Sequence, residues 1–451
     1  MRGPPGVGKT TLVMELVRQL QGASTVLATR QVREDLIEQF PFLGAEPDSI
    51  LGATDHMPRY TLRLEMLDLS DQFALFPQGI KRLHDHLASR PQHTTVIIDS
   101  WDAVIDQMRI QRAEFHRNWD HQDMELLLLE TLRALGRNLV LVREQQEPSR
   151  LDYLSDGILV LDYHLLDGRR VRQLHWEKLR GVAVSQNHYS FSLGEGTIRC
   201  FSAQPHQQQA LPLAGTWVGS GEEARLHTGC ADLDRLLGGG LAPGSHVLLE
   251  LSEKVSADLG LLLLGGPVVG TLGAGGGAFL LPSSGYDPRR LLSLLGQAVA
   301  PEHLAHLRLG VYAQHRDQPP LQEVLLSGAS IEKDFEVLWD TVFALSHDTG
   351  GPLLTSIAYD TVEYLYGREN GLKVLGASVA YLRNLRAVGI DTIRPSVAIA
   401  QQLRDITDIH LRLEQFHGVT LLLGVKPRFR WQAVLPEVGP QGLTLRLQPM
   451  T

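Results

Sequence analysis

The chain has 451 residues, more than one hydrophobic core usually supports, so we expect two or three domains. Its 43% hydrophobic and 21% charged residues are typical of soluble globular proteins. The formal net charge of −9 argues against a protein whose main role is to coat nucleic acid. Only Cys200 and Cys230 are present, which excludes a disulfide framework or a cysteine metal cluster and favours a reducing cytoplasm.

The first twelve residues, MRGPPGVGKTTL, contain a phosphate-binding loop. Residues 3–10 fit G-x-x-x-x-G-K-[ST] and stand directly before an amphipathic helical segment. In such loops backbone N–H groups surround phosphate, the lysine reaches the β- and γ-phosphates, and the hydroxyl binds Mg²⁺. We therefore predict a site for ATP and Mg²⁺, with Thr10 as a metal ligand. The predicted nucleotide-contacting residues are Gly3, Gly6, Val7, Gly8, Lys9, Thr10 and Thr11.

Strand-like and helix-like segments alternate along the chain. The runs STVLAT, TTVIID and NLVLV are short, apolar and bounded by polar residues, whereas TTLVMELVRQLQ and DMELLLLETLRALGR have helical apolar spacing. Such alternation predicts a parallel sheet covered by helices. The run TTVIID ends on Asp99, an acid at the place where P-loop domains hold Mg²⁺ through water, so we predict Asp99 as the second metal-site residue.

The segment after Asp99 leaves a role in DNA binding open. Gln107 to Trp119 reads QMRIQRAEFHRNW and mixes three arginines with two aromatic rings, which single-strand binding requires. The same residues also fit an amphipathic helix, and no zinc site, helix-hairpin-helix or strongly basic module supports DNA contact.

A charge-free stretch from Leu259 to Pro282 is long enough to cross a bilayer. The run Gly265-Gly266-Pro267 and the later glycines are expected to break a helix there. We therefore predict a buried helix, a glycine loop and a buried strand instead of a membrane span.

The chain contains an internal repeat. Tyr153 to Gly181 and Ile406 to Arg430 share an acid before a strand, a glycine turn, a second strand and then K-x-R. The acids, Asp156 and Asp408, are 252 residues apart, and the lysines of K-x-R, Lys178 and Lys426, are 248 residues apart. A shift of 248 residues moves the start of the P-loop to Leu251, directly after the strand-like GSHVLLE. We predict domains at 1–202 and 226–451, with a linker at 203–225 that is rich in proline, glycine and serine.

The P-loop, IIDSWDAV and LSDGILVLDY…GRRVRQLHWEKLRG together resemble the RecA-like ATPases of the KaiC type, a group that includes RadA-related proteins and the gas-vesicle regulator GvpD. The second copy opens with LHTGCADLDRLLGGGLAPGSHVLLEL, which is similar to the entry segment of KaiC domains. The resemblance covers essentially the whole chain. It implies an α/β fold of two tandem RecA-like domains, each a mostly parallel sheet flanked by helices.

The resemblance also implies a homo-oligomer with its ATP sites between neighbouring subunits. In the KaiC group the K-x-R near the domain end reaches the γ-phosphate of the neighbour, so Lys178 and Arg180 are implied to act in trans. The alternative is two exposed cations on a strand edge. The expected glutamate pair is replaced by Arg30-Gln31, where Gln31 can orient water but cannot accept a proton. Glu34 and Asp35 lie one turn farther along the chain. Because no glutamate occupies the expected position, slow hydrolysis is expected.

The second copy has lost its nucleotide site. The expected loop reads LSEKVSAD at residues 251–258, in which Ala257 replaces the lysine and Asp258 would repel phosphate. The counterpart of the Asp99 strand, LLTSIAYD, ends at Asp360 and is only loosely similar. The retained Lys426-Pro427-Arg428 leads to the hypothesis that the second copy lends these cations to the site of the first.

The first copy lacks an entry segment. Copy two has 25 residues before its loop position, Leu226 to Glu250, whereas only Met1 and Arg2 precede the loop in copy one. We therefore predict that the chain as given begins too late. A protein made from Met1 is then expected to bind ATP poorly and to be unstable.

Three functions remain open from the sequence. The favoured one is an ATP-binding KaiC-like ATPase with slow hydrolysis and a regulatory or signalling role. The alternatives are a RadA-like recombination or repair ATPase and a non-hydrolysing nucleotide-dependent switch. The expected partners are ATP, further copies of the chain and a protein partner, with DNA not favoured and no membrane.

Overall fold

The computed structural model describes residues 1–20, 24–28, 38–41, 87, 95–106, 121–144, 149–194, 197–204, 215–283, 286–312, 322–368, 370–439 and 442–451. The chain forms two compact units, Met1–Phe201 together with Thr451, and Ser202–Met450, here called unit 1 and unit 2. Each has its own α/β architecture.

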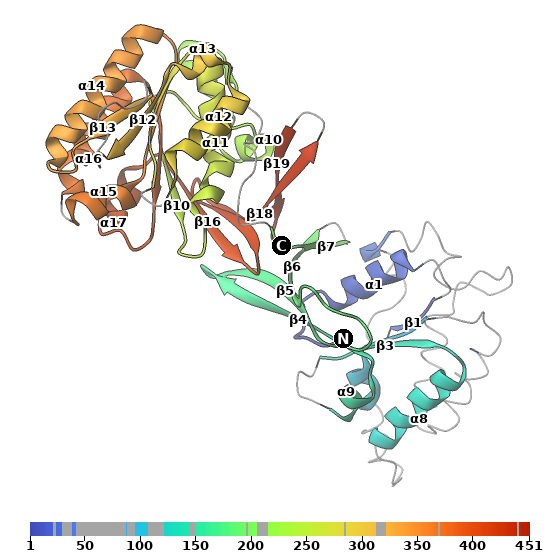
Figure 1. Cartoon of the computed structure of the whole chain (residues 1–451). Coiled ribbons are helices and arrows are strands. Elements are labelled where there is room, and N and C mark those ends of the chain that lie inside the picture. The colour runs from blue at the N-terminus through green and yellow to red at the C-terminus, as the bar shows by residue number, and fades with distance from the viewer. Residues whose placement is uncertain are drawn as a thin grey trace. The chain divides into compact units, whose positions relative to one another are not determined.

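Unit 1 combines a parallel and an antiparallel sheet. Its helices and strands are α1 Lys9–Gln19, β1 Ser24–Ala28, β2 Thr95–Asp99, α8 His121–Ala134, β3 Asn138–Val142, α9 Arg150–Leu154, β4 Gly157–Leu166, β5 Arg169–Leu179, β6 His188–Gly194 and β7 Thr197–Phe201. The order is β1-β2-β3, all parallel, and β4-β5-β6-β7, all antiparallel (Figure 1). The predicted strands, the two predicted helices and the parallel pairing of unit 1 are confirmed.

Met1 and Arg2 lie between β3 and β4. The Arg2 N–H donates to the Leu159 carbonyl at 2.9 Å, and the Leu161 N–H donates to the Arg2 carbonyl at 2.8 Å. On the other side the Arg143 N–H donates to the Met1 carbonyl at 2.9 Å. These two residues therefore occupy the place in the sheet from which the P-loop is expected to emerge.

Unit 2 is built on one ten-stranded sheet. Its elements are β8 Trp217–Val218, η2 Gly221–Glu223, β9 Arg225–Leu226, α10 Ala231–Leu236, β10 His246–Leu251, α11 Ala257–Gly273, β11 Gly277–Leu281, α12 Pro288–Ala298, α13 Pro301–Leu304, β12 Leu307–Tyr312, β13 Glu323–Leu326, α14 Ile331–Thr349, β14 Leu353–Ile357, α15 Tyr359–Tyr366, α16 Gly371–Leu385, β15 Val388–Ile393, α17 Ala400–Ile406, β16 Ile409–Phe416, β17 Val419–Lys426, β18 Phe429–Gly439 and β19 Gly442–Pro449. Since β8, η2 and β9 belong to unit 2, the fold of that unit includes the later part of the segment predicted as a linker.

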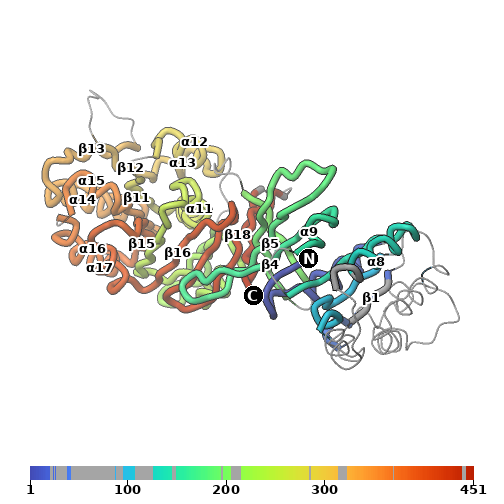
Figure 2. Tube along the Cα trace, turned by 90° about the horizontal axis from the view of Figure 1, so that it is seen from below, coloured from blue at the N-terminus to red at the C-terminus, as the bar shows by residue number. Residues whose placement is uncertain are grey.

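The sheet order in unit 2 is β13-β12-β11-β14-β15-β10-β16-β17-β18-β19. Figure 2 shows β12, β11 and β15 following one another toward β16 and β18. One apolar cluster involves α11 and α12, and a second involves α14, α15 and α16, so helices cover both faces of the sheet (Figure 1). β10, β11 and β14 of the parallel part are buried along their whole length because helices cover both faces of the sheet.

The two units share a strand order. From β11 onward unit 2 reads β11-β14-β15-β10-β16-β17-β18-β19, and unit 1 reads β1-β2-β3, then Met1 and Arg2, then β4-β5-β6-β7. The first hairpin of each antiparallel part turns through two residues with positive φ, Asp167-Gly168 in unit 1 and His417-Gly418 in unit 2. This agreement extends the internal repeat from sequence to topology.

The charge-free segment of unit 2 forms α11, a glycine turn and β11. The buried helix and the buried strand are confirmed, but the expected break at Gly265-Gly266-Pro267 is wrong, because α11 continues through it. The backbone N–H of Gly215 donates to the Gly266 carbonyl at 2.8 Å, so a neighbouring segment provides a hydrogen bond inside the helix. Among the described residues, no helix combines the length and apolar character needed to span a membrane.

Candidate functional site

The glycine-rich loop of unit 1 leads directly into α1. Gly6 has φ 72° and Gly8 has φ 110°, a region that favours glycine, and Gly8 is the N-cap of the helix. A Cβ on Gly3 would lie 2.3 Å from the carbonyl oxygen of Leu161. The glycines are thus required by backbone geometry and by close packing, and the loop leaves the N-terminus of α1 in a position to bind an anion.

Lys9 lies across this loop. Its Nζ donates to the carbonyls of Gly3 at 2.8 Å and Pro4 at 2.9 Å, and the residue is 7% exposed. These contacts keep a buried ammonium group beside the backbone amides at the start of α1. A phosphate there would meet both the positive charge and the N–H groups of the helix start.

Thr10 and Asp99 are brought together although 89 residues separate them. The Thr10 Oγ1 donates to the Asp99 Oδ2 at 2.7 Å, from the first turn of α1 to the end of β2. A hydroxyl and a carboxylate oxygen at the carboxyl end of a parallel strand suit the hard-oxygen preference of Mg²⁺. The donor set therefore fits the ion predicted from the sequence.

Val7 and Thr11 anchor the loop to the interior of unit 1. Val7 is 1% exposed and packs in a cluster with Leu12, Leu161 and Phe191. Thr11 is also buried. The apolar cluster joins the loop to β4 and β6 and so fixes where the phosphate-binding backbone lies.

Lys178 and Arg180 contact α9 in their own unit. The Lys178 Nζ donates to the Asp152 carbonyl at 2.6 Å and to the Tyr153 carbonyl at 3.3 Å. Arg180 donates to the Tyr153 carbonyl at 2.9 Å and is exposed. Both cations therefore stabilise the carbonyl end of α9. Their action on a neighbouring subunit stays a prediction.

The predicted water-activating residues Gln31 and Glu34 lie outside the described residues, as do Arg30 and the arginine-rich segment Gln107–Trp119. Their roles stay predictions.

In unit 2 side chains from other parts of the sequence hold the corresponding loop. Arg394 donates to the carbonyls of Ser252 and Val255, both at 2.6 Å. Asp258, at the position of Thr10, forms an ion pair with Arg290 at 2.9 Å. A guanidinium thus contacts loop carbonyls as Lys9 does in unit 1, and a carboxylate that pairs with Arg290 stands at the sequence position of Thr10. That unit 2 does not bind nucleotide stays a prediction.

The acid predicted as the unit 2 counterpart of Asp99 lies elsewhere. β14 ends at Ile357, so Ile357 has the strand-end position that Asp99 has in β2. Asp360 lies in the first turn of α15 and accepts a hydrogen bond from Ser283. The prediction that the strand extends to Asp360 is wrong, because the chain enters α15 at Tyr359.

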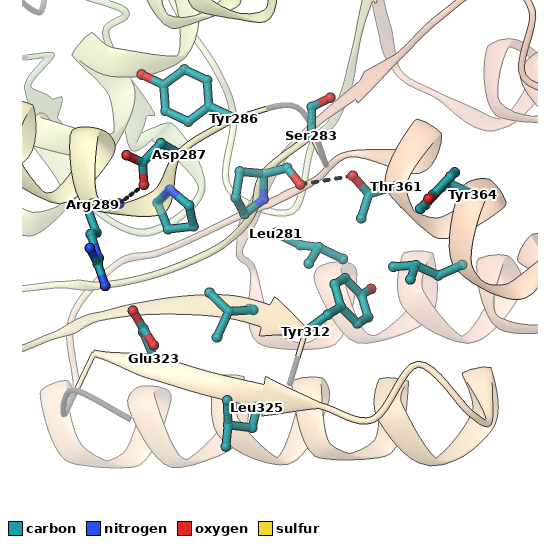
Figure 3. A pocket seen from close by; sticks show the side chains of 15 residues that line it. Leu281, Ser283, Tyr286, Asp287, Arg289, Tyr312, Glu323, Leu325, Thr361 and Tyr364 are labelled. Carbon is teal, nitrogen blue, oxygen red and sulfur yellow. Dashed lines mark hydrogen bonds between the residues drawn. The ribbon is translucent and has the colours of Figure 1, made fainter. Parts of the chain in front are cut away.

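A cavity of about 390 Å³ lies beside this position, at the ends of β11 and β12 (Figure 3). Tyr312 and Tyr364 line it together with two acids, Asp287 and Glu323. Arg289 is the only basic residue among its described lining. This lining offers less positive charge than a triphosphate requires, so we assign no nucleotide to the cavity.

A glycine-rich loop before a helix, with its lysine and a hydroxyl–carboxylate pair at the edge of a parallel sheet, defines the class of P-loop nucleotide-binding domains. Comparison with known families agrees, since residues 1–177 match the family described as GvpD gas vesicle protein, P-loop domain. The P-loop part of unit 1 is therefore similar to this P-loop domain.

Two proteins of Halobacterium salinarum are similar to the chain. It is 26% identical to Protein GvpD2 over 456 residues, which covers 95% of this chain and 88% of that protein. It is 28% identical to Protein GvpD1 over 270 residues, which covers 57% of this chain and 48% of that protein. The similarity to Protein GvpD2 therefore extends over both units.

Sequence reasoning missed Arg2, Asp152 and Arg394. Ser149-x-x-Asp152 has the form of a helix capping box, and the structure contains that box at the start of α9. The start of α9 could therefore have been predicted from the sequence. The contacts that Arg2 and Arg394 make had no local signal, because each depends on a partner far away in the sequence.

Proposed function

We propose that unit 1 binds Mg²⁺-ATP and hydrolyses it slowly, in a cytoplasmic protein with a regulatory role related to gas vesicles. The observation that carries this proposal is the Thr10–Asp99 hydrogen bond of 2.7 Å beside Lys9, which unites both halves of a magnesium–phosphate site. The gas vesicle association is carried over from the family that residues 1–177 match.

The chemistry assigned to each residue follows from its position. Backbone N–H groups of the loop and the start of α1 bind the phosphates, and Lys9 adds positive charge near the β- and γ-phosphates. Thr10 and Asp99 would hold Mg²⁺, which would supply charge neutralisation at the transferring phosphoryl group. Lys178 and Arg180 of a neighbouring copy add further charge in the transition state. Slow turnover is expected because Gln31 stands where a glutamate pair is expected.

Unit 2 is proposed to be a degenerate copy of the same RecA-like fold. Support comes from the shared strand order and from the Arg394 and Arg290 contacts that hold its loop and Asp258. In this proposal unit 2 contributes to assembly and regulation rather than to nucleotide binding.

Phosphate release separates this function from its alternatives. Wild-type protein is expected to release phosphate slowly from Mg²⁺-ATP, and Lys9→Ala is expected to abolish the release because it removes the charge on the β- and γ-phosphates. Stimulation by single-stranded DNA would favour a recombination-type ATPase instead. Tight ATP binding without any phosphate release would favour a non-hydrolysing switch.

A further inference from the structure

Arg2, the residue before the P-loop, is a buried arginine that pairs with two acids in unit 1. It is 7% exposed, although it is a charged residue. Its Nη1 lies 3.2 Å from the Asp152 Oδ2 in α9, and its Nη2 donates to the carboxylate of Glu177 in β5. Arg2 therefore connects the start of the loop to both elements that surround Lys178.

Both contacts of Arg2 lead to the K-x-R segment. Lys178 donates to the backbone carbonyl of Asp152, whose side chain pairs with Arg2. Glu177, the second acid, immediately precedes Lys178 in β5. A displacement of Arg2 would therefore shift the strand that carries Lys178 and the helix end that it contacts.

Unit 2 contains the same contact with its charges reversed. Glu250 lies between β15 and β16 as Arg2 lies between β3 and β4. Arg404 of α17 donates two hydrogen bonds to Glu250, of 2.9 and 3.0 Å, from the helix that corresponds to α9. Asp152 and Arg404 are 252 residues apart, the same spacing as the acids that precede β4 and β16.

The lysine contact is repeated as well. Lys426 donates to the carbonyl of Thr407, directly after α17, as Lys178 donates to carbonyls in α9. Burial alone would raise the pKa of the Glu250 carboxyl, but hydrogen bonds from His410 and Arg404 lower this pKa to about 2. In both units an ion pair thus joins the residue before the loop to the short helix before the first hairpin, α9 in unit 1 and α17 in unit 2. The acid and the base of this pair have exchanged places between the units.

The second partner distinguishes the two units. In unit 1 it is Glu177, next to Lys178, whereas in unit 2 it is His410 of β16, which contacts Glu250 at 2.9 Å. The residue before Lys426 is Val425, which cannot form an ion pair. The direct link to the K-x-R strand is therefore found in the unit that has the P-loop.

We propose that Arg2 is a positioning residue for ATP hydrolysis, which holds Lys178 and Arg180 in a fixed position on unit 1, from which they reach the ATP site of a neighbouring copy. This inference rests on the proposed function of unit 1. Cations that stabilise a phosphoryl transition state must be placed accurately, since a displacement of about 1 Å can cost about 100-fold in rate. Arg2 acts through Asp152 and Glu177 and does not touch the nucleotide.

The first test uses Glu177→Gln and Arg2→Gln in the full-length chain, with ATP affinity, kcat and melting temperature measured for each. Both variants are expected to lower kcat about 10-fold or more and to change the ATP Kd less than two-fold. The Glu177 side chain is 44% exposed, so its variant is expected to keep the wild-type melting temperature. The matched control is Arg18→Gln, which removes the exposed pair with Glu15 on α1.

The second test introduces the charge arrangement of unit 2 into unit 1 with the triple variant Arg2→Glu/Asp152→Arg/Glu177→Val. The three new residues correspond to Glu250, Arg404 and Val425. The triple variant is expected to regain the stability that Arg2→Gln loses, but not kcat, because the link to the K-x-R strand is absent. The positioning role is overturned if the triple variant recovers the wild-type kcat. It is also overturned if the kcat of Glu177→Gln lies within two-fold of that of the Arg18→Gln control. A wild-type chain without any ATP turnover instead contradicts the proposed function, and the role of Arg2 with it.

Discussion

Single residues determine whether the P-loop can form. Gly3, Gly6 and Gly8 were predicted from a local pattern. Gly6 and Gly8 have positive φ, a local backbone requirement, whereas Gly3 is required by its close approach to Leu161. Arg394 and Arg290 could not be predicted, since they contact the unit 2 loop and Asp258 from distant parts of the sequence. The proposed nucleotide-site residues of unit 1 could thus be predicted from short patterns, whereas the residues that contact the corresponding loop of unit 2 could be found only from the fold.

Gly3→Ala tests the close packing of the loop. The new Cβ would lie 2.3 Å from the Leu161 carbonyl oxygen, so the loop or β4 must move. We expect a loss of about 1–3 kcal/mol in the free energy of unfolding of unit 1 and weaker ATP binding. The control is Gly194→Ala at the end of β6, where nothing lies within 4 Å of the added Cβ. Urea unfolding that is equal for the two variants would contradict the packing argument.

At the scale of elements, the three strands and two helices predicted for the parallel part of unit 1 followed their predicted runs, because apolar periodicity is a local property. The exception is α11, which continues through Gly265-Gly266-Pro267 where the local signal predicted a break, and which packs closely against Gly215 there. Gly215 approaches the helix closely enough to donate to Gly266, and the absence of a side chain at Gly270 makes room for it. Such a contact depends on a segment about 50 residues earlier, which no local window includes.

Gly270→Ala tests this contact on α11. Its Cβ would lie 2.3 Å from the Gly215 carbonyl oxygen, so we expect a loss of about 1–3 kcal/mol in the stability of unit 2. Gly273→Ala on the same helix is the control, because nothing lies within 4 Å of its added Cβ. That control is expected to be neutral or slightly stabilising, since alanine favours helix. Thermal unfolding in which both variants behave alike would show that the close approach does not matter.

At the scale of the whole molecule, the tandem repeat was predicted from three similar spacings, and the shared strand order agrees with it. The reversed charges at Arg2 and Glu250 could not be predicted, because their equivalence depends on the positions of both residues within the sheets. The repeat also retains K-x-R in both copies, which is the basis for the hypothesis that unit 2 assists the site in unit 1.

Charge reversal at Lys426 and Arg428 tests that hypothesis. Lys426→Glu/Arg428→Glu is expected to slow ATP turnover, because it replaces two positive charges near a developing negative charge by two negative ones. The control is Arg430→Glu, an exposed cation on the neighbouring strand β18. The measurement is steady-state phosphate release. If the double variant turns over ATP as fast as Arg430→Glu does, Lys426 and Arg428 do not take part in the reaction.

We propose that unit 1, and not unit 2, binds ATP through its P-loop. The most direct measurement is calorimetric titration of the full-length chain with ATP, with and without Mg²⁺. Lys9→Ala is compared with Lys254→Ala, which removes an exposed lysine from the corresponding loop of unit 2. We predict one Mg²⁺-dependent site per chain that Lys9→Ala abolishes and Lys254→Ala leaves unchanged. Binding that survives Lys9→Ala, or that depends on Lys254, would contradict the account.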